Sequence, residues 1–259
     1  MPERLSERAS ERFAERDAAD GMITVRDLTK VFGINPVLRG LDLSVGRGEF
    51  VTLLGPNGSG KSTLLRILGA LSRPTSGTVR IGGWELPREA DFVRRQLGIV
   101  SHLPLLYDTL TAEENLYFFA RLYDLPAEQR AERVRAVLTR VGLWRRARDI
   151  VRTYSRGMLQ RLAIARAILH DPAVLLLDEP YTGLDQDAAA LLDDLLREVA
   201  VSGRTVLMTT HDLRRGHALA DRVVILSRGK IAFDQPSRAI DSAALPGLYA
   251  DVTGAASVR

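Results

Sequence analysis

The sequence predicts an α/β fold built on a mainly parallel β-sheet. Short apolar runs of strand length, such as Ala173 to Leu177, alternate with segments whose apolar residues recur at helical spacing. Regular alternation of strand and helix is typical of parallel sheets. The chain has 259 residues, of which 46% are hydrophobic and 26% charged, and this length suffices for one large domain or two small ones.

The expected elements follow from these patterns in chain order. Strands are predicted at 22–28, 37–45, 50–54, 78–83, 173–177, 205–210, 222–226 and 230–233. Helices are predicted at 61–71, 157–169 and 188–199, with two more inside 111–141 on either side of Leu125 and Pro126. The early strands within 22–54 and 78–82 suit an antiparallel β subdomain at the edge of the sheet. The helical stretch at about 105–165 is interpreted as an inserted α-helical subdomain.

Both ends of the chain differ from this central pattern. From Glu3 the first 20 residues repeat ERLS-ERAS-ERFA-ERDA, which places like charges on one helical stripe and offers no apolar core. A frayed helix or a disordered tail is therefore expected, with a docking arm as the alternative. We place a charged tail at 1–20, one domain at 21–245 and a C-terminal tail at 246–259.

Composition restricts the class of protein. No run approaches the roughly 18 apolar residues of a membrane helix, and no basic-then-apolar leader begins the sequence, so a cytosolic chain is expected. The chain has no cysteine, which excludes disulfides and thiolate metal sites. The net charge of +4 is compatible with nucleic acid or an anionic membrane. Because the basic residues are scattered along the sequence, no nucleic-acid partner is expected.

A glycine-rich segment lies between the predicted strand at 50–54 and a predicted helix. It matches the pattern G-x-x-x-x-G-K-[ST] of a phosphate-binding loop with Gly55, Pro56, Asn57, Gly58, Ser59, Gly60, Lys61, Ser62 and Thr63. Glycines let successive backbone N–H groups point at phosphates, and the helix N-terminus adds the positive end of its dipole. Lys61 is expected to reach the β- and γ-phosphates of ATP, and the Ser62 hydroxyl to ligate Mg²⁺.

Two carboxylates follow a second apolar strand, in the segment Val174 to Pro180. Asp178 is placed to hold Mg²⁺ through water, and Glu179 to polarise the attacking water as general base. A strand that ends in Asp-Glu is common by itself. The hypothesis of a hydrolytic site therefore depends on the phosphate loop upstream.

The chain carries five motifs in a fixed order. They are GPNGSGKST at 55–63, YSRGM at 154–158, LLLDEP at 175–180, TGLD at 182–185 and TTHD at 209–212. Over residues 22–240 the sequence resembles the nucleotide-binding subunits of ABC transporters. The resemblance implies the P-loop NTPase fold of ABC ATPases and hydrolysis of MgATP. It also implies that Phe32 stacks on adenine, that His211 is the switch histidine at the γ-phosphate, and that Asp185 lies in a loop crossing a dimer interface.

The signature segment departs from the Leu-Ser-Gly-Gly-Gln that is usual in this family. Tyr154, Arg156 and Met158 replace three of its residues, while Ser155 and Gly157 remain. A hydroxyl and an amide at a helix N-terminus can bind a phosphate. Ser155 and Gly157 are therefore expected to contact the γ-phosphate of ATP held by the opposite subunit.

A second departure is His102, which replaces a glutamine in a loop that touches the metal and couples to the membrane subunit in this family. Together with the SRGM signature and the segment Pro180 to Gly183, it resembles the ATP-binding subunit of the haem exporter of bacterial cytochrome c maturation. That resemblance implies a role in haem export, with no haem bound by this chain itself.

The family resemblance also implies partners. Two chains would form a homodimer that sandwiches two ATP molecules, acts on integral membrane permease subunits and lies peripherally on the cytoplasmic side of the inner membrane. The alternatives are the ATPase of another exporter of drugs, polysaccharides or lipids, an importer ATPase, a soluble ABC protein acting on nucleic acid, and a scaffold that does not hydrolyse ATP. A single cassette without cysteines or a long heptad run disfavours the nucleic-acid class, and the presence of Glu179 and His211 disfavours the scaffold.

Overall fold

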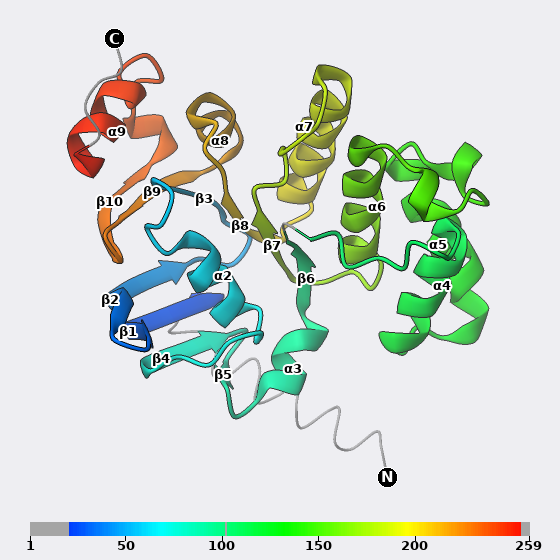
Figure 1. Cartoon of the computed structure of the whole chain (residues 1–259), viewed down its shortest axis with the longest axis horizontal. Coiled ribbons are helices and arrows are strands. Elements are labelled where there is room, and N and C mark those ends of the chain that lie inside the picture. Colours follow the sequence, from blue (N-terminus) through cyan, green and yellow to red (C-terminus); the bar gives the residue numbers. More distant parts are fainter. Residues whose placement is uncertain (1–20, 102, 255–259) are drawn as a thin grey trace.

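The computed structural model describes residues 21–101 and 103–254, which form two β-sheets and the helices around them (Figure 1). The predictions for the charged tail at 1–20 lie outside the described residues, as do the last five residues of the chain. In the described ranges, no helix is long and apolar enough to cross a membrane.

The larger sheet has six strands in the order β10-β9-β3-β8-β7-β6. They are β3 (Phe50–Leu54), β6 (Leu97–Val100), β7 (Val174–Asp178), β8 (Thr205–Thr209), β9 (Arg222–Ser227) and β10 (Lys230–Pro236). Five of these strands pair in parallel, and β10 pairs antiparallel with β9. The prediction of a mainly parallel core sheet is confirmed.

The smaller sheet is antiparallel throughout, in the order β2-β1-β4-β5. Its strands are β1 (Ile23–Phe32), β2 (Asn35–Val45), β4 (Ser76–Ile81) and β5 (Trp84–Leu86). The prediction that every strand from 22 to 54 belongs to this subdomain is wrong for β3, which lies between β8 and β9. All five residues of β3 are buried, and a strand that is apolar on both faces suits the interior of a parallel sheet, where both faces are covered.

Helices cover both faces of the larger sheet. They are α2 (Lys61–Leu68), α6 (Arg156–Ile168), α7 (Gln186–Val201) and α8 (Leu213–Leu219). Because side chains alternate along a strand, Leu175 and Leu177 of β7 join the core that contains α6 and α7, whereas Val174 and Leu176 join the core that contains α2 and the smaller sheet. The two cores hold the phosphate loop and the end of β7 in fixed relation.

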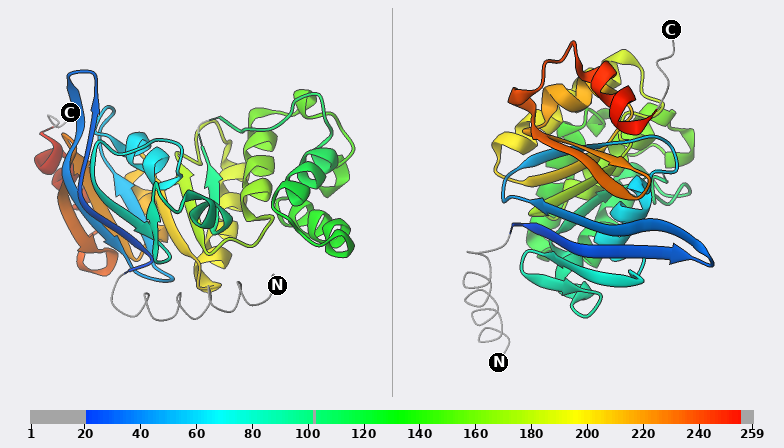
Figure 2. Two further views of the ribbon diagram at one scale, coloured as in Figure 1. Left: turned by 90° about the horizontal axis from the view of Figure 1, so that it is seen from below. Right: turned by 90° about the vertical axis from the view of Figure 1, so that its left-hand side faces the viewer.

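Three helices form a separate helical end of the molecule (Figures 1 and 2). They are α4 (Ala112–Leu122), α5 (Ala127–Arg140) and α6. A capping box starts α4: Thr111 Oγ1 accepts from the Glu114 N–H, and the Glu114 carboxylate accepts from the Thr111 N–H. The predicted pair of helices within 111–141, interrupted near Pro126, is confirmed.

Some elements are too short or too irregular for the sequence patterns to predict. They are β5, α3 (Ala90–Arg95), β6, α8 and α9 (Leu245–Thr253). The last of these corrects a domain boundary, because α9 begins where a tail is predicted. Tyr249 and Val252 of α9 pack against Val223 and Ile225 of β9, so the folded domain continues to α9.

Candidate functional site

The phosphate loop joins β3 to α2, and its backbone requires glycine at two positions. A Cβ added to Gly55 (φ 155) would lie 2.3 Å from the Leu226 carbonyl oxygen, and one added to Gly60 (φ 110) would lie 2.7 Å from Leu38 Cδ2. Gly60 is also the N-cap of α2, and no side chain caps this helix. Its first N–H groups therefore remain available to an anion.

Lys61 lies inside this loop with its ammonium group turned toward the end of β3. Its Nζ donates to the Gly55 carbonyl at 2.6 Å and to the Pro56 carbonyl at 3.2 Å. Burial lowers the pKa of Lys61, while the negative charges of Glu179 and Asp178 act in the opposite direction. The structure thus brings the predicted phosphate ligand close to both predicted carboxylates.

Asp178 accepts two hydroxyl hydrogen bonds on one oxygen. Ser62 Oγ lies 3.2 Å from Asp178 Oδ1, and Thr209 Oγ1 lies 2.7 Å from the same atom. The parallel register of β7 and β8 places Asp178 opposite Thr209. Thr209 is a site residue that sequence reasoning does not assign, although it stands in the TTHD motif.

Glu179 and His211 form a close pair at the same edge of the sheet. His211 Nδ1 lies 2.8 Å from Glu179 Oε2, and the His211 backbone N–H donates to this oxygen at 3.2 Å. The His211 side chain is 75% exposed and that of Glu179 only 23%. Glu179 has a φ of 51°, which is uncommon for a residue other than glycine. A shielded carboxylate beside an exposed imidazole can hold a water and pass its proton outward.

The oxygen atoms at this edge fit Mg²⁺. Ser62 Oγ and Asp178 Oδ1 are hard oxygen ligands that already lie within hydrogen-bond distance of each other. Mg²⁺ takes few protein ligands and fills its remaining positions with phosphate oxygens and water. In the described ranges no group of three or more His, Cys, Asp or Glu side chains is arranged to hold a metal, so phosphate and water would have to complete the coordination of Mg²⁺ here.

The signature residues lie on a different side of the molecule. Ser155 is the N-cap of α6, where its hydroxyl accepts from the Met158 N–H at 3.3 Å. A Cβ added to Gly157 would lie 3.7 Å from Ala188 Cβ, an ordinary contact, so the chain itself does not require glycine there. Figure 1 shows α6 separated from α2 by β7. One chain therefore does not bring Ser155 and Gly157 to its own phosphate loop.

Phe32 and Asp185 are two further predicted residues that the structure describes. Phe32 ends β1 and is 51% exposed, and Lys30 Nζ lies 4.7 Å from the centroid of its ring. Asp185 caps α7, because its Oδ1 accepts from the Ala188 N–H at 2.8 Å. His102 lies outside the described residues.

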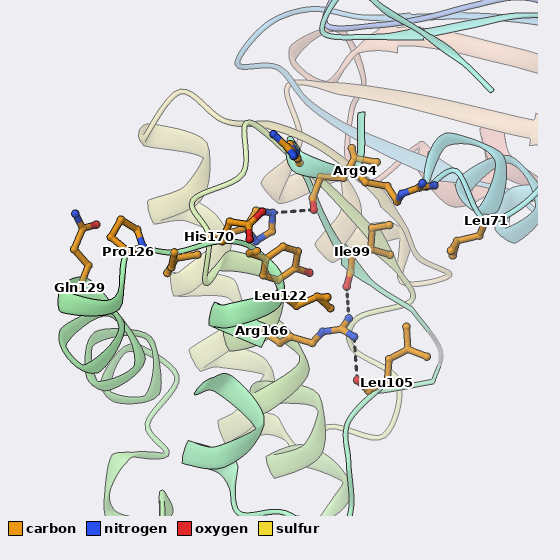
Figure 3. A pocket seen from close by; sticks show the side chains of 15 residues that line it. Leu71, Arg94, Ile99, Leu105, Leu122, Pro126, Gln129, Arg166 and His170 are labelled. Atoms are coloured by element: carbon orange, nitrogen blue, oxygen red, sulfur yellow. Dashed lines mark hydrogen bonds between the residues drawn. The ribbon is translucent and has the colours of Figure 1, made fainter. Parts of the chain in front are cut away.

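A groove of about 760 Å³ lies where the helical end meets β6 and α3 (Figure 3). Its apolar lining includes Leu71, Leu105 and Leu122. Arg166 of α6 is 5% exposed and donates from Nη1 to the Leu105 carbonyl at 3.1 Å and from Nη2 to the Ile99 carbonyl at 2.7 Å. These two hydrogen bonds connect α6 to the backbone of Leu105 and Ile99, which line the groove.

A histidine next to Arg166 makes a second attachment between the helical end and β6. His170 Nε2 lies 3.1 Å from the Leu97 carbonyl oxygen, and the imidazole stacks on Tyr123 with ring centroids 3.8 Å apart. Burial lowers the pKa of His170 to about 4. The imidazole is therefore neutral near pH 7 and donates to the Leu97 carbonyl through Nε2.

Known ATP-binding proteins are similar to this chain over most of its length. A sequence profile of the ABC transporter family matches residues 38–182. The Nod factor export ATP-binding protein I of Ralstonia nicotianae is 39% identical over 220 residues, which span 85% of this chain and 68% of that protein. The daunorubicin resistance ATP-binding protein of Streptomyces coeruleorubidus is 40% identical over 213 residues, which span 82% and 67%.

Solved structures show the same fold. The ATP-binding subunit of an ABC transporter superposes with a TM-score of 0.78 at 32% identity, covering 83% of this chain and 90% of the other. A dimeric ATP-binding cassette in a post-hydrolysis state, bound to ADP and Pi, gives a TM-score of 0.77 at 31% identity, covering 84% and 99%.

The phosphate loop, the carboxylates at the end of β7 and these similarities define an ABC ATPase. The chain belongs to the ABC transporter family and is an ATP-binding, ATP-hydrolysing subunit of a transporter. The finer prediction of haem export has no counterpart in these relatives, whose names refer to Nod factor export and daunorubicin resistance.

Proposed function

We propose that this chain energises the export of a drug or another organic compound through a membrane permease. The observation that carries the proposal is the 39–40% identity to proteins named for Nod factor export and daunorubicin resistance. A linearmycin resistance ATP-binding protein of Bacillus subtilis, 34% identical over 210 residues, adds a third relative with an export or resistance name. This is the exporter alternative that the sequence left open.

Haem export for cytochrome c maturation is the competing proposal. Its support is His102, the SRGM signature and Tyr181 in the segment after Glu179. These features cover only a few positions of the sequence, whereas the similarity to the named relatives extends over most of the chain. We therefore rank haem export second, and the absence of direct haem binding by this chain remains an expectation.

The proposed hydrolytic step uses groups that lie at the end of β7. Lys61 and the N-terminus of α2 bind the phosphates, and Ser62 and Asp178 would hold Mg²⁺, which would neutralise charge on the β- and γ-phosphates. Glu179 accepts a proton from the attacking water. His211, paired with Glu179 at 2.8 Å, orients that carboxylate and faces the γ-phosphate.

Ser155 and Gly157 complete the site of a second copy in this proposal. The support is their position at the N-terminus of α6, away from their own phosphate loop (Figure 1). Phe32 would stack on the adenine, and Asp185 would lie between the two chains. ATP binding would close the homodimer, and hydrolysis would reopen it.

The groove between the helical end and β6 is the proposed contact with the permease. Exposed apolar side chains at Leu105 and Leu122 suit a short helix of a membrane subunit. The chain would then lie peripherally on the cytoplasmic side of the membrane. A Leu122→Asp variant is expected to keep ATPase activity in solution and to lose transport.

One strain distinguishes the two export proposals. In cells whose sole copy carries Lys61→Ala, we expect an organic compound normally found in the medium to accumulate inside, or sensitivity to a drug to rise. Mass spectrometry of medium and cells measures the first outcome, and growth across a drug panel measures the second. Staining of denaturing gels for covalent haem is expected to be normal. Loss of c-type cytochromes with unchanged compounds would instead favour haem export.

A further inference from the structure

Tyr181 lies two residues after Glu179 and contacts two helices. Its Oη donates to Asp193 Oδ1 of α7 at 2.6 Å, and the Arg215 guanidinium of α8 lies 5.1 Å from its ring centroid. The Tyr181 side chain is half-buried, and its carbonyl accepts from the Leu184 N–H at 3.1 Å. Tyr181 therefore connects the turn that follows Glu179 to both α7 and α8.

Arg215 lies in the first turn of α8, directly after the turn that carries His211. Its backbone N–H donates to Asp212 Oδ1 at 3.0 Å, and its Nε lies 3.5 Å from Asp212 Oδ2. Asp212 directly follows His211 in the chain. The stacking of Arg215 on Tyr181 thus joins the His211 turn to the Glu179 turn through side chains, in addition to the direct Glu179–His211 contact.

The backbone of Glu179 needs such support. Its φ of 51° is uncommon for a residue with a side chain, and such a conformation persists only where neighbouring contacts hold it. On one side, the Glu179 N–H donates to Thr209 Oγ1 at 3.1 Å. On the other side, the Thr182 N–H donates to the Glu179 carbonyl at 3.1 Å, and Tyr181 lies between them.

We propose that Tyr181 is a positioning residue for hydrolysis, which uses Asp193 and Arg215 to hold Glu179 and His211 in their reactive arrangement. A hollow of about 330 Å³ lined by Tyr181, Arg215 and His211 leaves room for this arrangement to relax when the ring is lost. Among the described residues, Tyr181 makes no hydrogen bond, ion pair or ring contact with the phosphate loop, so nucleotide binding is expected not to depend on it.

The test measures steady-state ATP hydrolysis and binding of a non-hydrolysable ATP analogue by the full chain. For Tyr181→Leu we expect kcat to fall about tenfold, with KM and analogue affinity within about twofold of the wild type. Tyr181→Phe keeps the ring on Arg215 and loses only the hydroxyl bond, so a smaller loss of about threefold is expected. Arg215→Gln is expected to resemble Tyr181→Leu.

Two comparisons make the role specific. The double variant Tyr181→Leu/Arg215→Gln is expected to lose less activity than the product of the two single losses, because both single changes already remove the Tyr181–Arg215 contact. Tyr107→Leu, an aromatic change in an exposed position before α4, is the matched control and is expected to leave kcat unchanged.

Other results would overturn the proposal. They are a kcat for Tyr181→Leu within twofold of the wild type, losses that multiply in the double variant, or a fall in analogue affinity that accounts for the lost rate. If Tyr181→Leu does not fold, as judged by circular dichroism, Tyr181→Phe and Arg215→Gln decide by the same criteria.

Discussion

The catalytic edge of the large sheet and the helical end are organised differently. At the catalytic edge, side chains from α2, β7 and β8 touch one another: Ser62 and Thr209 share one oxygen of Asp178, and Glu179 meets His211. At the helical end, Ser155 caps its own helix, and within the described part of the chain it makes no hydrogen bond to any of these groups. In the proposed dimer, one chain would hold a complete acid–base and phosphate-binding set but only half of each composite site.

The largest expected effect concerns the general base at the catalytic edge. Glu179→Gln keeps the shape of the side chain and removes the carboxylate, so turnover should fall by on the order of 10² or more while ATP still binds. Steady-state ATPase rates and equilibrium binding of labelled ATP measure the two quantities. Near-normal turnover in a pure preparation would refute the role of Glu179. Lys61→Ala is the contrasting variant, because it should weaken nucleotide binding itself.

A smaller effect is expected at Thr209, which contacts Asp178 and not the phosphate loop. Thr209→Val removes the hydroxyl that donates to Asp178 at 2.7 Å and keeps the shape of the residue. Asp178 then loses one of two fixed hydrogen bonds, and turnover should fall about tenfold with an increased requirement for Mg²⁺. Titration of ATPase activity with MgCl₂ measures both changes. Thr139→Val is the matched control, because the Thr139 hydroxyl donates only to the Arg135 carbonyl within α5. An unchanged Mg²⁺ dependence would show that the Thr209 hydroxyl does not act through Asp178, since its other bond is to the Glu179 N–H.

The stability of the helical end should depend on pH through His170. Burial lowers the pKa of His170 to about 4 in the folded chain, below the ordinary value of about 6.5. The unfolded chain therefore binds the proton first, so the stabilisation is fully present above pH 6.5 and is lost as pH falls toward 4. At pH 5 this loss amounts to about 1–2 kcal/mol of the free energy of unfolding.

Denaturant unfolding between pH 7 and pH 5 measures this loss. His170→Phe keeps the stacking on Tyr123 and removes the titrating group, so its pH dependence should be flatter by about 1–2 kcal/mol. Hydrogen exchange should locate the difference in α4 and α6. Parallel curves for the two proteins would show that His170 does not titrate as its environment indicates.

Sequence reasoning found the parts of the site that are contiguous in the chain. The phosphate loop from Gly55 to Ser62 and the Asp178–Glu179 pair each follow an apolar strand, so local pattern suffices. Contacts made by tertiary packing were not accessible in the same way. Thr209 reaches Asp178 only because β7 and β8 pair in register, and no local pattern encodes that pairing.

The errors in the fold have similar causes. β3 has no period-2 alternation, because it is buried on both faces, so its position in the sequence between β2 and α2 misled the assignment to the antiparallel subdomain. α9 carries few charged residues and a proline near its start, and its stability comes from packing on β9. Packing of this kind is visible only once the sheet is formed.

The composite site is the central claim, and mixing two inactive chains tests it most directly. A Lys61→Ala chain and a Ser155→Arg chain form mixed dimers with one doubly defective site and one intact site. If α6 acts on the nucleotide of the other chain, an equimolar mixture should recover about a quarter of wild-type ATPase activity, since half of the dimers are mixed and each has one working site of two.

The matched control mixes a Lys61→Ala chain with a Glu179→Gln chain. Each of these changes damages the site of the nucleotide that its own chain binds. Every site in this mixture is therefore defective, and no recovery is expected. Subunit exchange is verified in both mixtures by two affinity tags. Recovery in the first mixture and none in the control is the predicted result. Equal, negligible activity in both mixtures, with mixed dimers present, would contradict the composite site and place Ser155 at the nucleotide of its own chain.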